Sequence, residues 1–322
     1  MTLTRSRQRS FTNPHPWRGP SYSLSLTSAA LSLAGVASAM QTQTPHELPP
    51  SLIFVTAGID HDLGTDLDDA GDVSVTRTRA TIGFHRRLHE RWVLRGQIGA
   101  EHANYGWSSD ALFLGSNDPW SEIWKVGAGL QLIRKLDDHW NLEGSVTAVS
   151  TAEPDAELDE SIDYRLRFSA SWRRDENLTL GLDLTASTHL EDSTLVLPFP
   201  TVDWRFDEKW RLVSDIGDVI KGPSVGVHRT LSDELDLGLV AVGVYNDARL
   251  DDGPVPDGVL RETRVAAGIE ANWKPRLGIK VSILGGYDVW GELQVDDADG
   301  DEIEKTRLDP APLLGLSVQF AF

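Results

Sequence analysis

Long runs of this sequence alternate apolar and polar residues with a period of two. One such run, 162–172, carries on a single face Ile162, Tyr164, Leu166, Phe168, Ala170 and Trp172. This period belongs to β-strands, in which successive side chains point to opposite faces. The runs extend over ten or more residues, whereas soluble strands usually contain about five or six residues and tilted membrane-spanning strands about nine to eleven. The alternation therefore predicts strands that cross a membrane.

Strands that span a bilayer must form a closed sheet, because lipid offers no partner to an unpaired backbone group. Six short turn phrases, such as "RRLHERWVL" from 86 and "RKLDDHWNL" from 134, separate the runs. With a first and a last strand they predict an all-β, transmembrane, antiparallel up-and-down barrel of about 14 strands. Twelve strands remain the alternative, because Pro198, Pro200 and Pro223 interrupt the region 195–231 and proline removes a ladder donor.

The longer connections are acidic and are expected on the outer side of the membrane, with the short turns in the periplasm. These connections begin at residues 60, 101, 151, 246 and 291. Tryptophans lie near both kinds of connection and predict two interfacial girdles. Those near the short turns are Trp92, Trp140, Trp172, Trp204, Trp210 and Trp273, and those near the long loops are Trp107, Trp120 and Trp290.

The first forty residues have the composition of a secretory signal. Arg5, Arg7, Arg9 and Arg18 precede an apolar, small-residue stretch that ends at Ala37-Ser38-Ala39. We expect residues 1–39 to be a signal peptide, 40–50 a short periplasmic segment and 51–322 the barrel in the cell outer membrane. Without the signal, 26 basic residues face 49 acidic ones, a net charge of −23. This charge argues against nucleic acid as a partner, because phosphate binding requires clustered Lys and Arg.

The chain ends in "SVQFAF", in which apolar residues alternate up to the final Phe322. This end resembles the terminal strand of bacterial outer-membrane proteins. The resemblance implies that Phe320 and Phe322 form an assembly signal recognised by the barrel-assembly machinery, and that outer-membrane lipid is a partner. The segment "LPFPTVDWRFDEKWRL" from 197 resembles a family of uncharacterised outer-membrane barrels, which implies no activity.

The polar faces of the runs supply candidate lumen-lining residues. These are Arg77, Arg79, Glu101, Lys125, Glu143, Asp163, Arg165, Arg167, Asp183 and Glu270. Their charges nearly cancel, so we expect opposite charges on neighbouring strands to pair, with the acidic excess in the outer loops. An anion filter formed by Arg165 and Arg167 is the functional alternative.

Few residue patterns point to chemistry. Cysteine is absent, which excludes thiolate sites. The acidic "DADGD" at 297–301 does not form an EF-hand, because Val295 and Arg307 would occupy its first and last ligand positions; loose binding of divalent cations by the acidic loops remains an alternative. His61, His102 and His189 are expected near the outer rim without a distinctive motif. We therefore predict neither a cofactor, nor a defined metal site, nor an enzyme.

Three functions stay open for such a barrel. The first is a porin-like channel for small solutes or ions, with a modest cation preference arising from the acidic rim. The second is a structural or surface-binding barrel with a closed lumen, and the third is an outer-membrane enzyme with a His/Asp site at the rim. A continuous water path would favour the channel, and a loop folded into the bore would favour the closed forms.

Overall fold

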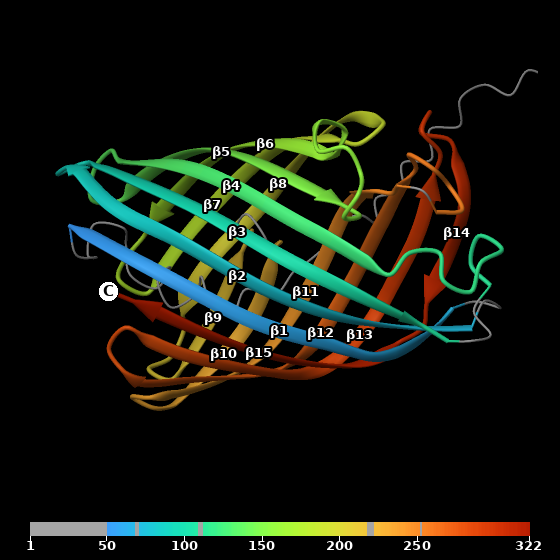
Figure 1. Cartoon of the computed structure of the whole chain (residues 1–322). Helices are drawn as coiled ribbons and strands as arrows, with labels where there is room; N and C mark the ends of the chain where they lie inside the picture. Colours follow the sequence, from blue (N-terminus) through green and yellow to red (C-terminus); the bar gives the residue numbers. More distant parts are fainter. Residues whose placement is uncertain (1–49, 68–70, 109–111, 218–221, 252) are drawn as a thin grey trace, which may run out of the picture.

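The computed structural model describes residues 50–67, 71–108, 112–217, 222–251 and 253–322. They form one closed antiparallel β-barrel (Figure 1). Its elements are β1 (Ser51–Leu67), β2 (Gly71–His89), β3 (Trp92–Trp107), β4 (Glu122–Lys135), β5 (Trp140–Ala152), the 3₁₀ turn η1 (Asp159–Ser161), β6 (Ile162–Arg173), β7 (Leu178–His189), β8 (Asp192–Arg205), β9 (Trp210–Asp215), β10 (Ser224–Ser232), β11 (Leu235–Arg249), β12 (Val259–Arg276), β13 (Ile279–Asp296), β14 (Glu302–Leu308) and β15 (Ala311–Ala321). The predicted signal peptide lies outside the described residues.

The barrel closes where β1 pairs with the last strand of the chain. Both β14 and β15 pair with β13 on one side and with β1 on the other, so they are two parts of one barrel strand. Pro310 separates them, as expected for a residue without a ladder donor. The barrel therefore has 14 strands, which confirms the predicted architecture. The terminal Phe322 belongs to the seam, because its N–H donates to the carbonyl of Ile53 at 2.9 Å.

The outward face of the strands is the apolar one. Leu130, Leu182 and Phe168 expose 53%, 56% and 65% of their surface, values that a soluble core would not allow but a lipid-facing wall requires. Among the described residues, no helix is long and apolar enough to cross a membrane. The alternation seen in the sequence is thus the alternation between lipid and barrel interior.

The short turns owe their shape to aspartates in the repeated phrase. Asp137 Oδ1 accepts the backbone N–H groups of His139 and Trp140, each at 2.8 Å. These bonds stabilise the carboxylate and lower the pKa of Asp137. Asp175 accepts in the same way from the N–H groups of Asn177 and Leu178. The recurring polar group is therefore a side-chain cap that folds the chain back between two strands.

Two expectations about the outer end of the barrel were wrong. Acidic segments assigned to loops belong to strands: β1 continues to Leu67 and β13 to Asp296, so Asp60 and Asp62 face the interior and are buried. The expected outer girdle also loses a member, since Trp120 is only 2% exposed and packs inside the barrel, with Trp107 against it. The strands extend further outward than the sequence indicated, and their outer ends enclose buried side chains.

In the part of the chain that the structure describes, the strand pairing of the wall is incomplete beside β9 and β10, and we call the unpaired stretch next to β8 the wall opening. Strands β8 and β9 pair only from Asp203–Val213 to Arg205–Arg211. Among the described residues, the part of β8 from 192 to 202 pairs with β7 alone, and the part of β11 from 243 to 248 pairs with β12 alone. The prolines in β8 fit such an edge, because they carry no N–H to offer a neighbour.

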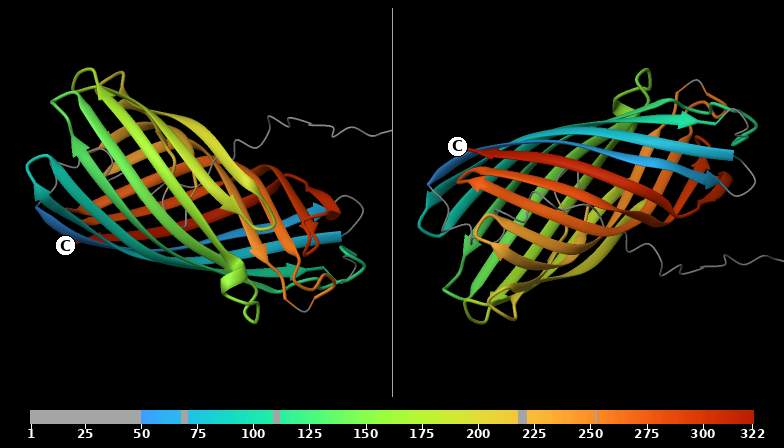
Figure 2. Two further views of the ribbon diagram at one scale, coloured as in Figure 1. Left: turned by 90° about the horizontal axis from the view of Figure 1, so that it is seen from above. Right: turned by 90° about the horizontal axis from the view of Figure 1, so that it is seen from below.

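The outer end of β11 leans into the barrel. Arg249 pairs in parallel with Ala152 at the end of β5, although β6 to β10 lie between these strands around the wall. Both faces of this end are buried, since Asp247, Ala248 and Arg249 are 3%, 2% and 4% exposed. Figure 2 shows the β7–β8 hairpin beside the outer ends of β11 and β12, where Arg249 bonds Glu191 at 2.5 Å. The outer end of β11 therefore lies inside the ring of strands.

Candidate functional site

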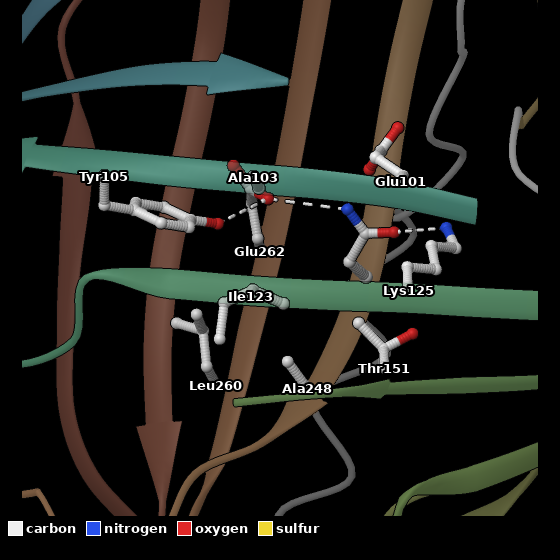
Figure 3. A pocket seen from close by; sticks show the side chains of 10 residues that line it. Glu101, Ala103, Tyr105, Ile123, Lys125, Thr151, Ala248, Leu260 and Glu262 are labelled. Atoms are coloured by element: carbon white, nitrogen blue, oxygen red, sulfur yellow. Dashed lines mark hydrogen bonds between the residues drawn. The ribbon is translucent and has the colours of Figure 1, made fainter. Parts of the chain in front are cut away.

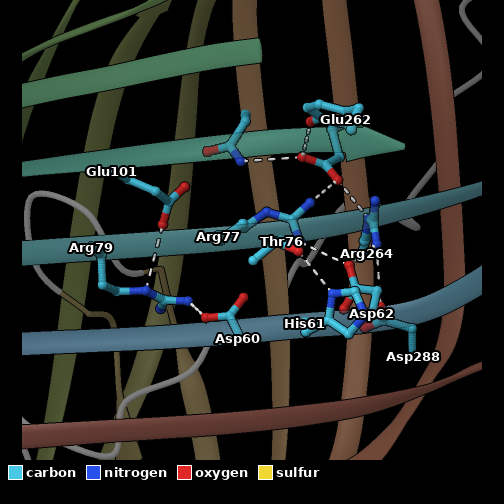
Figure 4. A network of polar contacts seen from close by, with 12 residues as sticks. Asp60, His61, Asp62, Thr76, Arg77, Arg79, Glu101, Glu262, Arg264 and Asp288 are labelled. Carbon is cyan, nitrogen blue, oxygen red and sulfur yellow. Dashed lines mark hydrogen bonds and ion pairs between the residues drawn. The ribbon is translucent and has the colours of Figure 1, made fainter. Parts of the chain in front are cut away.

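A buried network of five charged side chains crosses the interior near the outer end (Figure 4). Arg77 on β2 contacts Asp62 on β1 at 2.9 Å and Glu262 on β12 at 2.5 Å. Arg264, two residues further along β12, contacts Asp62 and Glu262 at 2.5 Å each and Asp288 on β13 at 3.3 Å. We call these five residues the charge knot. It joins strands from opposite ends of the chain and leaves little of any side chain exposed to water.

A second ion-pair group lies beside the knot, on the periplasmic side along β1 and β2. Arg79 pairs with Asp60 and lies 3.6 Å from Glu101 on β3. Their side chains are about one-tenth exposed. Together the two groups place opposite charges on neighbouring strands across the whole width of β1–β3, which is the arrangement that stabilises strand pairing.

Apolar side chains fill the barrel outward of the charge knot. Val73 and Val75, on the same face of β2 as Arg77, are each 1% exposed, and Leu293 on β13 is fully buried. The β3–β4 connection adds Phe113, which is fully buried and lies 5.8 Å from the Trp120 ring in an edge-on contact. This cluster, the outer plug, comprises Leu67, Val73, Val75, Ala103, Tyr105, Phe113, Trp120, Ile123, Ala248, Leu250, Val255, Leu260, Leu293, Val295 and Leu308. Phe113 and Trp120, which precede β4, thus lie within the bore.

A small cavity separates the outer plug from the polar interior (Figure 3). Its volume is about 10 Å³, room for about one water molecule. A chain of hydrogen bonds borders it: Lys125 Nζ donates to Asn246 at 2.7 Å, and Tyr105 donates to Glu262 at 3.3 Å. Polar and apolar parts of the interior therefore meet around a cavity that is too small for a solute larger than water.

Some inward side chains in the periplasmic half are less buried than those of the charge knot. Arg167 on β6 bonds Asp183 on β7 at 2.5 Å, yet its side chain is 22% exposed, compared with 2% for Arg264 in the charge knot. Gln131 donates to Glu143 at 2.6 Å on the same inward face, and both are half-buried. Water reaches these three side chains, and we call the space beside them the vestibule; Asp183 next to Arg167, and Val93 and Ile133 nearer the periplasmic end, are fully buried.

The wall opening beside β8 is lined by apolar residues that face inward. Leu195, Leu197 and Phe199 pair with the inward-facing Ser187, Thr185 and Asp183 of β7. Leu197 is 41% exposed, although it does not face lipid. The inner face of β8 is thus an apolar strip between the vestibule and the unpaired edge of the wall.

The ten predicted lumen-lining residues all lie on the inward face, but the structure divides them among separate groups. Arg77, Arg79 and Glu101 belong to the outer ion pairs, and Glu270 bonds Asn272 at 2.7 Å on β12. Asp163 and Arg165 lie on the inward face of β6, where Val149 and Thr147 are their partners on β5. The sequence analysis missed Asp60, Asp62 and Glu262, because it assigned Asp60 and Asp62 to a loop and did not extend the inward face of β12 to Glu262.

The acidic "DADGD" segment forms a turn. Asp297 Oδ1 accepts the backbone N–H groups of Asp299 and Asp301 at 3.0 and 2.9 Å. Its carboxylate therefore stabilises the turn that connects β13 and β14. Loose binding of divalent cations by the acidic loops stays a prediction.

Residues 116–320 match the model of a domain of unknown function, DUF6268. The match covers more than half of the chain, so the protein belongs to the DUF6268 family. No curated protein matches the sequence.

Solved structures resemble this barrel at low identity. The COG4313 outer membrane channel from Pseudomonas putida F1 is 13% identical, with a TM-score of 0.47 over 85% of this chain and 97% of that one. The P. putida toluene transporter TodX is 8% identical, with a TM-score of 0.47 over 86% and 91% of the two chains. A Pseudomonas aeruginosa FadL homologue is 12% identical, with a TM-score of 0.45 over the same shares. Likenesses this distant carry no argument about function.

Proposed function

We propose that this DUF6268 protein is an outer-membrane channel whose solutes pass between the periplasmic vestibule and the wall opening beside β8. Small apolar or amphipathic molecules are the solutes that such a route suits. One observation carries the proposal: the outer end of the bore is filled by side chains, while the wall is open beside an apolar strip.

The axial route is blocked by well-packed groups. A solute moving straight outward would have to displace the outer plug and separate the ion pairs of the charge knot. Separating one partner from a buried ion pair costs about 3–5 kcal/mol, and the knot contains several such contacts. This packing does not favour the cation-preferring axial pore that the acidic rim suggested.

The lateral route offers a graded environment. A molecule in the vestibule meets half-buried polar groups such as Glu143 and Arg167, and then the inward strip of Leu195, Leu197 and Phe199. Transfer of apolar surface from water onto such a strip contributes about 25 cal/mol per Å². From the strip, the unpaired edge of β8 leads to the lipid-facing side of the wall.

The test follows uptake of N-phenyl-1-naphthylamine, a small apolar dye, by cells that carry the protein in the outer membrane. Wild type should raise the uptake rate over cells without the protein. Leu197→Arg, which places a charge on the strip, should abolish most of this increase. Thr147→Arg, an inward change on β5 away from the opening, is the matched control and should leave uptake near that of wild type.

Planar-bilayer recording separates the alternatives. A steady ion conductance that Leu197→Arg leaves unchanged, without dye uptake, would contradict the lateral route and favour an axial pore. If folded protein showed no conductance and no dye uptake, the structural barrel would be favoured. The filled outer end also fits that function.

A further inference from the structure

A line of hydrogen bonds joins β7 to the leaning end of β11, and the proposed transport does not require it. Ser187 Oγ lies 3.2 Å from His189 Nε2, and His189 Nδ1 lies 2.7 Å from Asp247 Oδ2. A serine hydroxyl on one ring nitrogen and a carboxylate on the other is the arrangement that activates a serine nucleophile. We infer that Ser187, His189 and Asp247 form the catalytic triad of an acyl-ester hydrolase.

The fold sets the roles of the three residues. Ser187 and His189 are two residues apart on β7, so both point to the inward face. Asp247 comes from β11 and reaches His189 because the outer end of that strand leans into the barrel. Its side chain is fully buried and that of His189 is 8% exposed. A buried carboxylate fixes the imidazole as the Nδ1–H tautomer, which leaves Nε2 free to accept the serine proton.

Two neighbouring groups support the triad. The Tyr245 hydroxyl lies 3.4 Å from Asp247 Oδ2 and its ring stands edge-on to His189, with ring centroids 5.3 Å apart. Arg165 is the direct cross-strand partner of Ser187 on β6, where facing Cβ atoms lie about 4.5–5.5 Å apart. A guanidinium at this place can stabilise the negative charge that develops on a carbonyl oxygen attacked by Ser187.

The substrate class follows from the other neighbour of Ser187. Its partner on β8 is Leu195, the first residue of the apolar strip that continues through Leu197 and Phe199. An acyl chain lying along this strip presents its carbonyl group to Ser187. The substrate is therefore a carboxylic ester of a lipid. Its access through the wall opening rests on the proposed function, whereas the chemistry of the triad does not.

The reaction balances with water as the only co-reactant. Ser187 Oγ attacks the carbonyl carbon and its proton passes to His189 Nε2. The ester C–O bond then breaks, and His189 returns the proton to the departing alcohol, leaving the acyl group on Ser187. Water attacks this acyl-serine by the same path, which yields the free fatty acid and restores the serine. Asp247 keeps its hydrogen bond to His189 and stabilises the imidazolium.

The experiment uses the full-length protein refolded in detergent, with folding checked by its altered mobility on unheated gels. A fluorophosphonate probe should label wild type at one site, which peptide mass spectrometry should locate at Ser187. Vesicles of dioleoylphosphatidylcholine should release fatty acid. Ser187→Ala and His189→Asn should each lower this release by about 10³-fold or more, and Asp247→Asn should also lower it strongly.

Controls distinguish catalysis from a structural role. Ser145→Ala changes an inward serine on β5 and should keep both labelling and release. Ser187→Ala should keep dye uptake, so loss of hydrolysis and failure of the proposed transport are separable. Absence of labelling and release in folded wild type would overturn the inference, as would labelling that persists in folded Ser187→Ala. In that case the three residues only fasten the β7–β8 hairpin to β11.

Discussion

Replacing Arg264 by methionine tests whether the charge knot holds the outer end together. The knot contains three carboxylates, Asp62, Glu262 and Asp288, and two guanidinium groups. Arg264 contacts all three carboxylates, and its side chain is 2% exposed. Methionine preserves much of the volume but leaves three buried carboxylates with Arg77 alone. Removing one partner from a buried ion pair costs about 3–5 kcal/mol, and we expect a loss of this size.

The matched variant is Glu262→Gln, which removes a charge from the same knot. It leaves Asp62 and Asp288 against Arg77 and Arg264, so the charges balance, and the amide oxygen still accepts from the arginines. We expect a loss of about 1 kcal/mol, the ordinary contribution of a hydrogen bond. The balance of charges left in the knot, rather than the number of contacts removed, therefore determines which variant loses more stability.

The assay is urea unfolding of protein refolded into lipid vesicles, followed by tryptophan fluorescence. The free energy of unfolding of Glu262→Gln should be close to that of wild type, and that of Arg264→Met should be well below it. A loss of less than about 1 kcal/mol for Arg264→Met would contradict the assignment of a tightly coupled buried knot, given the usual cost of a broken buried pair. So would the reverse order of the two variants.

Three further changes test the membrane assignment. Leu130→Arg, on the lipid face, should cost about 2–4 kcal/mol at mid-bilayer, and Thr147→Arg, on the inward face, should cost much less; equal losses in lipid-refolding titrations would contradict the register. Phe322→Ala should lower the folded yield in cells but change the stability of refolded barrel by less than about 0.5 kcal/mol, because the side chain is 76% exposed and the backbone bonds to Ile53 remain. The mass of membrane-extracted protein should correspond to cleavage between Ala39 and Met40, and an intact N-terminus would refute export by this signal.

The wall of the barrel could be predicted from the sequence because lipid imposes one rule on every strand. Leu130, Leu166 and Leu182 all belong to alternating apolar series, and all prove to be exposed on the outward face. The rule needs no knowledge of which strands touch across the interior. Each short turn joins two membrane-spanning strands, so counting the turns also predicted the number of strands.

The closed outer end could not be predicted in the same way, although the sequence contains a signal for it. Val73 and Val75 share a face with Arg77, so the inward face changes from charged to apolar toward the outer end. Sequence alone does not decide whether such residues fill a bore or continue into a loop. The knot itself joins Arg77 to Glu262 across 185 residues, a contact between strands that do not pair with each other.

The short β9–β10 hairpin connects the three unusual features of this barrel. Among the described residues, the β9–β10 pairing ends at Asp215–Ser224, the outer end of β11 has no partner on that side, and Arg249 pairs with Ala152. Ala248 on this end of β11 packs with side chains from β2, β4 and β13 in the outer plug. The same missing pairs leave the opening beside β8, and this end of β11 brings Asp247 to His189. All three features lie beside this unpaired end of β11, so we expect a change that restored pairing between β10 and β11 beyond Val242 to weaken all three together.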